Sequence, residues 1–588
     1  MLKLFKNFTK RDWLFSFISF CFIFGQVWLE LKIPDYMSEV TKLVQTEGSK
    51  MSAILENGGY MLLCAFGSLV AAVIVGYFIS YVSANFSKAL RSKLFRKVES
   101  LDLHEVKQFS PASLITRTTN DITQIEMFIG MGLQLLIKAP ITAIWAITKI
   151  SNKSWQWSAT TAICVVIVLS VVSSLIIFVI PKFKIVQKLV DRLNLVTREN
   201  LTGIRVVRAF NAEKYQEDKF SDANNDLTNT QMFIQKGFAI MSPMMFLVMH
   251  MMTLAIFFIG AHLIDAALMS DKIAIFGDMV VFSSYATQII MSFLLLAMIF
   301  MIMPRAQVSA KRISEVLDTD VSILDGTITK HKNNTRGKVE FKNVSFKYPD
   351  AEEYLLKDIS FVANKGETVA FIGSTGSGKS TLINLIPRFY DATDGEVLID
   401  EINIKDYKQS FLHDLIGYVP QKAVMFQGTI KDNVSYGKGN KKVTMDAIKK
   451  AIRIAQAKDF VNKIDKKENG FVASSGTNIS GGQKQRLSIA RAIARNPEFY
   501  VFDDSFSALD YKTDAVLRKE LKKNTKDATT FIVAQRIGTI LNADKIVVLD
   551  EGKCVGIGTH KELLKKCSVY KQIALSQLSK EELEHEGK

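Results

Sequence analysis

A glycine-rich segment past the middle of the chain has the residue types that bind phosphate. Residues 373–381 read Gly-Ser-Thr-Gly-Ser-Gly-Lys-Ser-Thr, a spacing in which backbone N–H groups turn inward around an anion. Lys379 is expected to reach the β- and γ-phosphates of a nucleotide, and the Ser380 hydroxyl to bind Mg²⁺. The residues of this predicted ATP site are Gly373, Ser374, Thr375, Gly376, Ser377, Gly378, Lys379, Ser380 and Thr381.

The segments around this loop predict how it is held. The run Glu367–Ile372 has the composition of a buried strand that leads into the loop, and Thr381–Ile386 begins a helix. Val339–Phe346 alternates apolar and polar residues, as a half-buried strand does. Strand-like and helical stretches alternate beyond it. We therefore expect residues 337–588 to form an α/β P-loop NTPase domain.

The first half of the chain has a different composition. A chain that is 48% hydrophobic and still 22% charged is best explained by a membrane half joined to a soluble half. We expect an all-α membrane domain over residues 1–320 and a polar linker over 321–336. Its six apolar stretches reach the length of about 20 residues that a membrane helix needs. They are Trp13–Ile33, Tyr60–Tyr81, Met131–Ile150, Thr160–Ile180, Phe238–Leu263 and Met279–Met303.

The net charge of +16 is explained by the positions of the cations. The loops after the second and fourth spans are long and basic, and so is the N-terminal segment Met1–Arg11. Positive charge marks the cytoplasmic side of a membrane protein, so both termini are expected there, and no nucleic acid is expected as a partner. The cysteines lack a C-x-x-C pair and are expected to stay reduced: Cys21, Cys64, Cys164, Cys554 and Cys567.

Two features of the spans leave alternatives open. Lys138 lies within the third span, where it either extends to the cytoplasmic interface or faces an inner cavity. The last two spans are rich in methionine, for which an adaptable binding cavity and ordinary helix packing are both consistent readings. These methionines include Met241, Met244, Met245, Met249, Met251, Met252, Met279, Met291, Met298 and Met303.

Further motifs narrow the family. The run Ile479–Gln483, followed by a helix-forming segment, resembles the signature sequence of ABC transporter nucleotide-binding domains. Phe499–Asp504 resembles the Walker B strand that follows the signature in this family, and Asp510 ends a segment that resembles the D-loop. Tyr348 stands where the family stacks an aromatic ring on adenine, and Gln421 where it has the Q-loop glutamine. Six spans fused to one such domain resemble a half-transporter of the type I exporters.

The resemblance implies a site shared by two chains. In this family two ATPase domains pair head to tail, and each ATP lies between one P-loop and the signature of the other chain. It assigns Mg²⁺ binding to Ser380, Gln421 and Asp503. It also implies that the signature residues of this chain serve the site of the partner, namely Ser480, Gly481, Gly482 and Gln483.

Two residues depart from the family pattern where the chemistry takes place. Asp504 stands at the position of the general base, which is usually glutamate, and Gln535 stands where a histidine contacts the γ-phosphate. A shorter carboxylate falls short of the attacking water, and general-base action is typically worth about 10²–10⁴-fold in rate. Asp504, Gln535 and Asp510 are thus the catalytic candidates of a site expected to hydrolyse ATP poorly.

The whole chain resembles the degenerate-site subunit of heterodimeric bacterial multidrug ABC exporters. This predicts a second, non-identical half-transporter as partner, and an amphipathic or hydrophobic small molecule or lipid as substrate. A homodimeric exporter and an ATP-gated channel or regulatory subunit are the alternatives. Closure of the ATPase domains is expected to act on short transverse helices near Ser113–Asp121 and Glu199–Phe210.

Overall fold

The structure is a computed structural model that describes residues 2–46, 48–151, 154–268, 271–331, 336–437 and 443–577. Residues 332–335 of the predicted linker, and 438–442 and 578–588 of the predicted ATPase domain, lie outside the described residues. The chain divides into two compact units. Met1–Ser100 and Phe109–Thr319 form the membrane unit, and Leu101–Gln108 joins Asp320–Lys588 in the ATPase unit.

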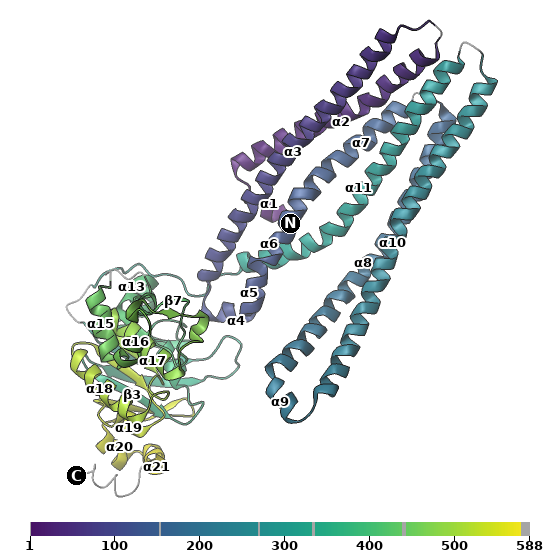
Figure 1. Cartoon of the computed structure of the whole chain (residues 1–588). Coiled ribbons are helices and arrows are strands. Elements are labelled where there is room, and N and C mark those ends of the chain that lie inside the picture. Colours follow the sequence, from purple (N-terminus) through teal and green to yellow (C-terminus); the bar gives the residue numbers. More distant parts are fainter. Residues whose placement is uncertain are drawn as a thin grey trace. The chain divides into compact units, whose positions relative to one another are not determined.

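The described part of the membrane unit is helical (Figure 1). Its elements are α1 (Leu2–Phe5), α2 (Lys10–Gln45), α3 (Met51–Glu99), α5 (Pro111–Thr118), α6 (Asn120–Met127), the π-helical turn η1 (Phe128–Gly132), α7 (Leu133–Ser151), α8 (Trp155–Thr202), α9 (Ile204–Ala209), α10 (Glu213–Ala266) and α11 (Lys272–Asp318).

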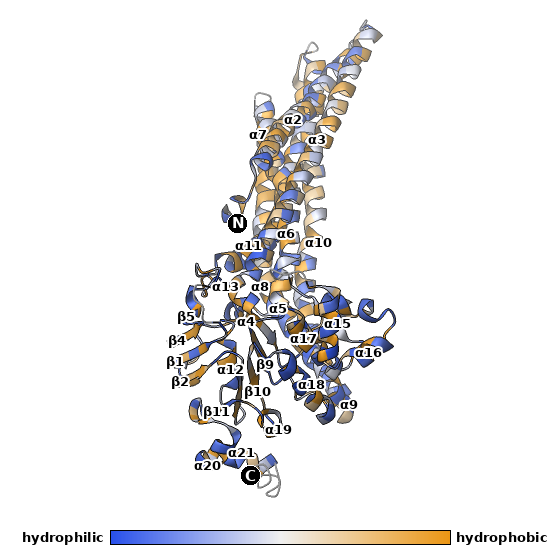
Figure 2. Ribbon diagram, turned by 90° about the vertical axis from the view of Figure 1, so that its left-hand side faces the viewer, coloured by the Kyte–Doolittle hydropathy of each residue, from blue (hydrophilic) through white to orange (hydrophobic). Residues whose placement is uncertain are grey.

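The prediction of six membrane spans is confirmed. Within the described residues, six helical segments are long and apolar enough to cross a bilayer. Figure 2 shows hydrophobic residues along much of α3 and α7. Large apolar side chains such as Leu62 and Phe17 point outward, with 74% and 64% of their surface exposed. A helix satisfies all of its own backbone hydrogen bonds, so such a surface is stable in lipid.

The long helices pack in pairs. α2 lies along α3, α8 lies along α10, and α11 packs against α7 (Figure 1). The buried Trp157 of α8 fixes one such pair, because its indole Nε1 donates a hydrogen bond to the Ile256 carbonyl of α10 at 3.1 Å. The short helix α9 stands between α8 and α10, within the predicted transverse segment Glu199–Phe210.

The other predicted transverse segment, Ser113–Asp121, falls on two short helices, and its action on the ATPase domain stays a prediction. It forms α5 and α6, which belong to the membrane unit and pack against α11. The sequence explains the break: Ser110 caps α5 and Pro111 begins it, so the preceding helix ends there. Arg117 then holds α5 on α11 through hydrogen bonds to the Arg312 carbonyl and, at 3.0 Å, to Glu315. A further short helix, α4 (Leu103–Phe109), groups with the ATPase unit over Leu103–Gln108.

The ATPase unit contains a six-stranded sheet in the order β12-β11-β3-β10-β9-β6 and a four-stranded antiparallel sheet in the order β2-β1-β4-β5. A short pair, β7 and β8, completes the described strands. The strands are β1 (Val339–Phe346), β2 (Leu356–Ala363), β3 (Thr368–Gly373), β4 (Asp394–Ile399), β5 (Ile402–Asn403), β6 (Ile416–Val419), β7 (Gly428–Thr429), β8 (Phe471–Val472), β9 (Phe499–Asp503), β10 (Thr529–Val533), β11 (Lys545–Asp550) and β12 (Lys553–Gly558).

Helices cover these sheets and short 3₁₀ turns connect them. The helices are α12 (Lys379–Asn384), α13 (Gln409–Leu415), α14 (Ile430–Val434), α15 (Met445–Ile454), α16 (Lys458–Lys463), α17 (Gly481–Ala494), α18 (Tyr511–Asn524), α19 (Ile537–Ile540), α20 (His560–Lys566) and α21 (Ser568–Gln577), and the turns are η2 (Ile404–Asp406), η3 (Lys467–Asn469) and η4 (Ser474–Gly476).

The central sheet is buried on both faces. Alternate residues of β9 enter two different cores: Tyr500 and Phe502 pack with α15, α17 and α18, whereas Phe499 and Val501 pack with β1 and β2. Strands β3, β6, β9 and β10 run parallel, so their carboxyl ends meet at one edge of the sheet. In sheets of this kind ligands bind at that edge, and the predicted ATP site lies on the loops that leave it.

Candidate functional site

The phosphate-binding loop leaves β3 and enters α12. Gly376 and Gly378 have φ values of 85° and 93°, a left-handed conformation that favours glycine. At Gly373 the chain passes the Leu549 carbonyl so closely that a Cβ atom would lie 2.0 Å from its oxygen. The spacing of glycines in the motif is therefore required by the path of the backbone.

Lys379 lies over the loop that precedes it. Its ammonium donates hydrogen bonds to the carbonyls of Gly373 at 2.9 Å and Ser374 at 2.7 Å, and to the Ser377 hydroxyl at 3.3 Å. Burial lowers the pKa of Lys379 from its ordinary value, and the two aspartates Asp503 and Asp504 oppose this effect. The lysine is thus a cation in a partly desolvated position, where an added phosphate group interacts with it strongly.

The predicted Mg²⁺ ligands of the loop and of β9 lie together. The Ser380 hydroxyl donates a hydrogen bond of 2.8 Å to Oδ1 of Asp503. Burial raises the pKa of the Asp503 carboxyl, and the neighbouring charge of Asp504 raises it further. A hydroxyl and a carboxylate are the oxygen ligands that Mg²⁺ takes together with water and phosphate, so the residues present fit this ion.

Asp504 lies at the centre of a small polar cluster. Its Oδ2 accepts hydrogen bonds from the side-chain amides of Gln535 at 2.8 Å and Gln421 at 3.2 Å. The backbone of Asp504 is in the left-handed region, with φ of 45°, and its N–H donates to the Val533 carbonyl at 3.1 Å. Burial raises the pKa of this carboxyl as well. The structure thus joins three residues that lie far apart in the sequence, on the loops after β9, β10 and β6.

Tyr348 and Thr381 connect the four-stranded sheet to the phosphate loop. The Tyr348 hydroxyl and the Thr381 Oγ1 are 3.0 Å apart, and the ring packs edge-on against Phe346 and Tyr390. The ammonium of Lys107, from α4, lies 5.7 Å from the centre of the Tyr348 ring. Tyr348 is therefore an aromatic platform beside the loop, and Lys107 is a neighbour of it that the sequence alone did not reveal.

Helix α4 and the preceding Asp102 also contact the segment that leads into the ATPase unit. Oδ2 of Asp102 accepts hydrogen bonds from the backbone N–H of Ile323 at 2.8 Å and the Ser322 hydroxyl at 3.2 Å. The Ser322 hydroxyl also donates to Glu105 of α4. These bonds explain why Leu101–Gln108 groups with the ATPase unit, whose other residues begin only at Asp320.

The signature residues begin α17. Ser480 caps this helix: its backbone N–H donates to Oε1 of Gln483 at 2.9 Å, and the Gln483 N–H donates back to the Ser480 hydroxyl at 3.3 Å. A Cβ atom at Gly481 would meet nothing within 4 Å, so this helix start is open. The recorded hydrogen bonds of Ser480 and Gln483 stay within their own helix, and the structure does not join them to the phosphate loop.

Asp510 is likewise separate from the catalytic cluster. It caps α18, where its Oδ1 accepts a hydrogen bond of 2.9 Å from the Thr513 N–H. This bond lowers the pKa of the Asp510 carboxyl, which lies at the surface. Within one chain, its observed role is that of a helix cap.

Comparison with known proteins agrees with this geometry. A family model of the ABC transporter transmembrane region matches residues 16–293, and a model described as ABC transporter matches residues 356–507. An uncharacterized ABC transporter ATP-binding protein of Mycobacterium tuberculosis is 39% identical over 525 residues, which cover 88% of this chain and 87% of the relative. The chain belongs to the ABC transporters.

Two further similarities concern better described proteins. An ATP-dependent lipid A-core flippase of Pseudomonas aeruginosa is 30% identical to this ABC transporter chain over 517 residues, covering 87% of the chain and 83% of the flippase. The solved structure of a bacterial Atm1-family ABC exporter with ATP bound has a TM-score of 0.82 at 22% identity, and covers 97% of this chain and all of that one. The fold prediction of six membrane helices followed by an ABC ATPase domain is confirmed, and ATP-driven transport is the activity of this family.

The membrane unit of the transporter resolves the alternatives for Lys138. Its ammonium donates a hydrogen bond of 2.9 Å to Oε1 of Glu30, and both side chains line a cavity of about 360 Å³ between α2, α7 and α11. Lys138 therefore faces an inner cavity. Glu30, an acid within the first apolar helix, was missed by sequence reasoning, although a charged residue inside a span is itself a signal.

The methionines of the last two spans divide between the two readings. Most of the buried ones form the helical core, namely Met241, Met245, Met252 and Met279. Met291 lines the cavity beside Lys138, and Met244, together with the core residue Met241, lines a second cavity of about 590 Å³ between α8 and α10. Most of the buried methionines therefore take part in ordinary helix packing, and a few methionines line cavities.

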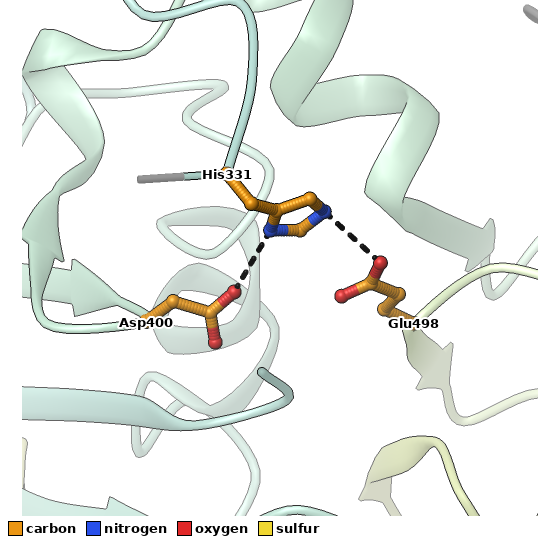
Figure 3. Close-up of side chains that lie close together, drawn as sticks. All are labelled: His331, Asp400 and Glu498. Carbon is orange, nitrogen blue, oxygen red and sulfur yellow. Dashed lines mark ion pairs between the residues drawn. The ribbon is translucent and has the colours of Figure 1, made fainter. Parts of the chain in front are cut away.

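A third group of ionisable residues lies in the ATPase unit, outside the nucleotide cluster (Figure 3). His331 stands between Asp400 and Glu498, with Nδ1 3.5 Å from one carboxylate and Nε2 3.1 Å from the other. Burial raises the pKa of Asp400, whose Oδ2 has no hydrogen-bond donor among the described residues. Because the two ring nitrogens face different carboxyl groups, the arrangement fits a histidine that bridges two acids better than it fits three ligands around one metal ion.

Proposed function

We propose that this chain is one half of a heterodimeric ABC exporter, which moves amphipathic or hydrophobic compounds, multidrug-like or lipid-like, out of the cell. Its own P-loop would contribute to an ATP site that hydrolyses poorly, and its signature to the active site of a non-identical partner chain. The observation that carries the proposal is the Asp504 cluster, in which a short carboxylate is paired with two neutral amides, those of Gln535 and Gln421.

The residues that would hold ATP are proposed from their positions. The phosphate loop Gly373–Thr381 would enclose the phosphates, and Tyr348 would stack on the base. When bound, Mg²⁺ would neutralise phosphate charge, held by Ser380 and Asp503, whose oxygens are 2.8 Å apart, with Gln421 nearby. Ser480–Gln483 and Asp510 lie outside this cluster within the chain, which supports their proposed role at the site of a second chain.

Asp504 and Gln535 would position the attacking water in such a site. Asp504 is held by two amide donors, so its Oδ2 is engaged rather than free to accept a proton from water. Gln535 offers a neutral N–H to a phosphate oxygen but carries no positive charge. Both features favour binding of ATP over its cleavage.

We infer the orientation of the chain in the membrane from the positions of its positive charges. The chain would lie in the cell membrane with both termini in the cytoplasm, and with a membrane domain over residues 1–320, a linker over 321–336 and an ATPase domain over 337–588. The basic loops after the second and fourth spans support this orientation. The lipid A-core flippase among the relatives supports lipid-like cargo.

The test is the ATPase activity of the purified chain, alone and together with the half-transporter encoded beside it, each with and without Asp504→Glu. The heterodimer predicts near-background turnover for the chain alone, robust turnover for the pair, and a modest effect of the substitution in the pair. Ordinary exporter rates for the chain alone would show a homodimer instead. Nucleotide-dependent ion flux without pumped substrate would favour a gated channel.

A further inference from the structure

The cavity between α2, α7 and α11, which we call the Glu30 cavity, is lined by both charged and apolar residues. Glu30 and Lys138 supply the charges, and Gln288 and Ser284 supply further polar groups. Apolar surface comes from residues such as Ile33 and Met291. The cavity has about 360 Å³, enough for a small polar group and the first part of an attached chain.

The charged pair retains unused binding capacity. Oε1 of Glu30 accepts three hydrogen bonds, from Lys138 at 2.9 Å, Gln26 at 2.9 Å and Ser68 at 3.1 Å. Among the described residues no donor reaches its Oε2. An ammonium has three N–H donors, and that of Lys138 gives one to Glu30. Their side chains keep 29% and 22% of their surface exposed.

A second ion pair joins the same two helices and serves as an internal comparison. Asp35 of α2 and Lys149 of α7 lie 2.7 Å apart, and Asp35 also accepts a hydrogen bond of 2.6 Å from Tyr285. Their side chains are 32% and 33% exposed, but neither residue is among the described residues that line the Glu30 cavity. An ion pair between α2 and α7 can therefore form without this cavity beside it.

We propose that the Glu30 cavity binds the zwitterionic head group of an amphipathic substrate. The cationic part of the head group would contact the free oxygen of Glu30, and the anionic part the remaining donors of Lys138. This inference rests on the proposed transport of amphipathic compounds and names their chemical class.

Electrostatics favours a zwitterion over a singly charged ligand. The site has no net charge, because one carboxylate and one ammonium stand 2.9 Å apart. A ligand with one charge is attracted by one group and repelled by the other at almost the same distance. A zwitterion in the opposite orientation is attracted at both ends, and in a site of low dielectric constant the difference is large.

The experiment compares three photoreactive amphiphiles that share one alkyl chain and carry phosphocholine, trimethylammonium or phosphate as the head group. The full-length chain is labelled in dodecyl maltoside micelles, whose uncharged head groups do not compete, and labelled peptides are mapped by mass spectrometry. We expect at least about fivefold more labelling of α11 by the phosphocholine probe. Lys138→Met should reduce that labelling about tenfold, whereas Lys149→Met, the matched control, should change it less than about twofold.

A second variant keeps the test decisive if Lys138→Met does not fold. Met291→Trp fills the cavity without touching the ion pair, and should also abolish phosphocholine labelling. Equal labelling by the three probes, or equal losses in Lys138→Met and Lys149→Met, would overturn the proposal and leave the pair as a tie between helices. Neither nucleotide nor partner chain is present, so this failure is distinct from failure of the ATPase test.

Discussion

Restoring the usual catalytic residues should raise the ATP turnover of the chain. In the structure the Asp504 carboxylate is held at 2.8 Å by Gln535 and at 3.2 Å by Gln421. Asp504→Glu adds one methylene and moves the carboxylate about 1.5 Å farther from the backbone. Gln535→His replaces a neutral amide by a group that can carry charge beside the γ-phosphate. Together they supply a general base and its orienting partner.

The expected gain follows from the value of general-base action. A factor of about 10²–10⁴ corresponds to roughly 2.7–5.4 kcal/mol of activation free energy. We expect the double variant of the purified chain to exceed the unsubstituted chain by about 10²-fold, at the lower end of that range, because the site remains adapted to aspartate. The assay is steady-state phosphate release at saturating Mg·ATP, after size-exclusion chromatography has shown self-association.

Two results would refute this reasoning. An unsubstituted chain that already turns over within about threefold of the double variant would mean that Asp504 and Gln535 act as full equivalents of the usual pair. Activity in the double variant that survives Lys379→Ala would mean that the phosphate is released at another site. Lys379 contacts three atoms of its own loop, so its removal should abolish phosphate binding here.

Three further outcomes are expected. Because burial raises the pKa of both Asp503 and Asp504, these carboxyls are protonated at a higher pH than ordinary aspartates. The affinity for ATP in the presence of Mg²⁺ should therefore fall early on acidification. The affinity measured in EDTA should change less, and both are measured by fluorescent-nucleotide titration. Tyr348→Ala should weaken ATP binding by about 1 kcal/mol, roughly fivefold, in the same titration. Tyr348→Phe loses only the hydroxyl near Thr381, so its affinity for ATP should stay within about twofold of that of the unsubstituted chain. His331→Ala removes the ring that stands between the carboxyl groups of Asp400 and Glu498. It should lower the free energy of unfolding of the ATPase unit by about 1–3 kcal/mol in urea at pH 7, with a smaller loss in His331→Ala/Glu498→Gln; equal losses would show that the Glu498 carboxyl is irrelevant to the effect.

The sequence predicted those parts of the structure that depend on local pattern. The apolar spans are set by length and composition, and the phosphate loop by glycines whose backbone angles other residues rarely adopt. The strand that ends at Asp503 was predictable because a parallel strand buried on both faces is almost continuously apolar.

Features that depend on distant contacts were not predictable in the same way. The pairing of Glu30 with Lys138 requires the rotation of two helices about their axes, and no local pattern states it. The attachment of α5 to α11 is another example, because it depends on the bond from Arg117 to Glu315, almost 200 positions away. The hydrogen bonds that Asp102 accepts from Ser322 and Ile323 join residues more than 200 positions apart.

That last contact has a consequence for biosynthesis. Leu101–Gln108 leaves the ribosome before the whole of Phe109–Thr319, yet its partners begin with Ser322 and Ile323. At a translation rate of about 5–20 residues per second, synthesis of the roughly 210 intervening residues takes some 10–40 s. During that interval the Asp102 carboxylate lacks the Ser322 and Ile323 donors that it has in the folded chain. An ATPase fragment made from residue 320 onward would never acquire α4, so the ATPase unit is completed only in a chain whose membrane part has already been synthesised.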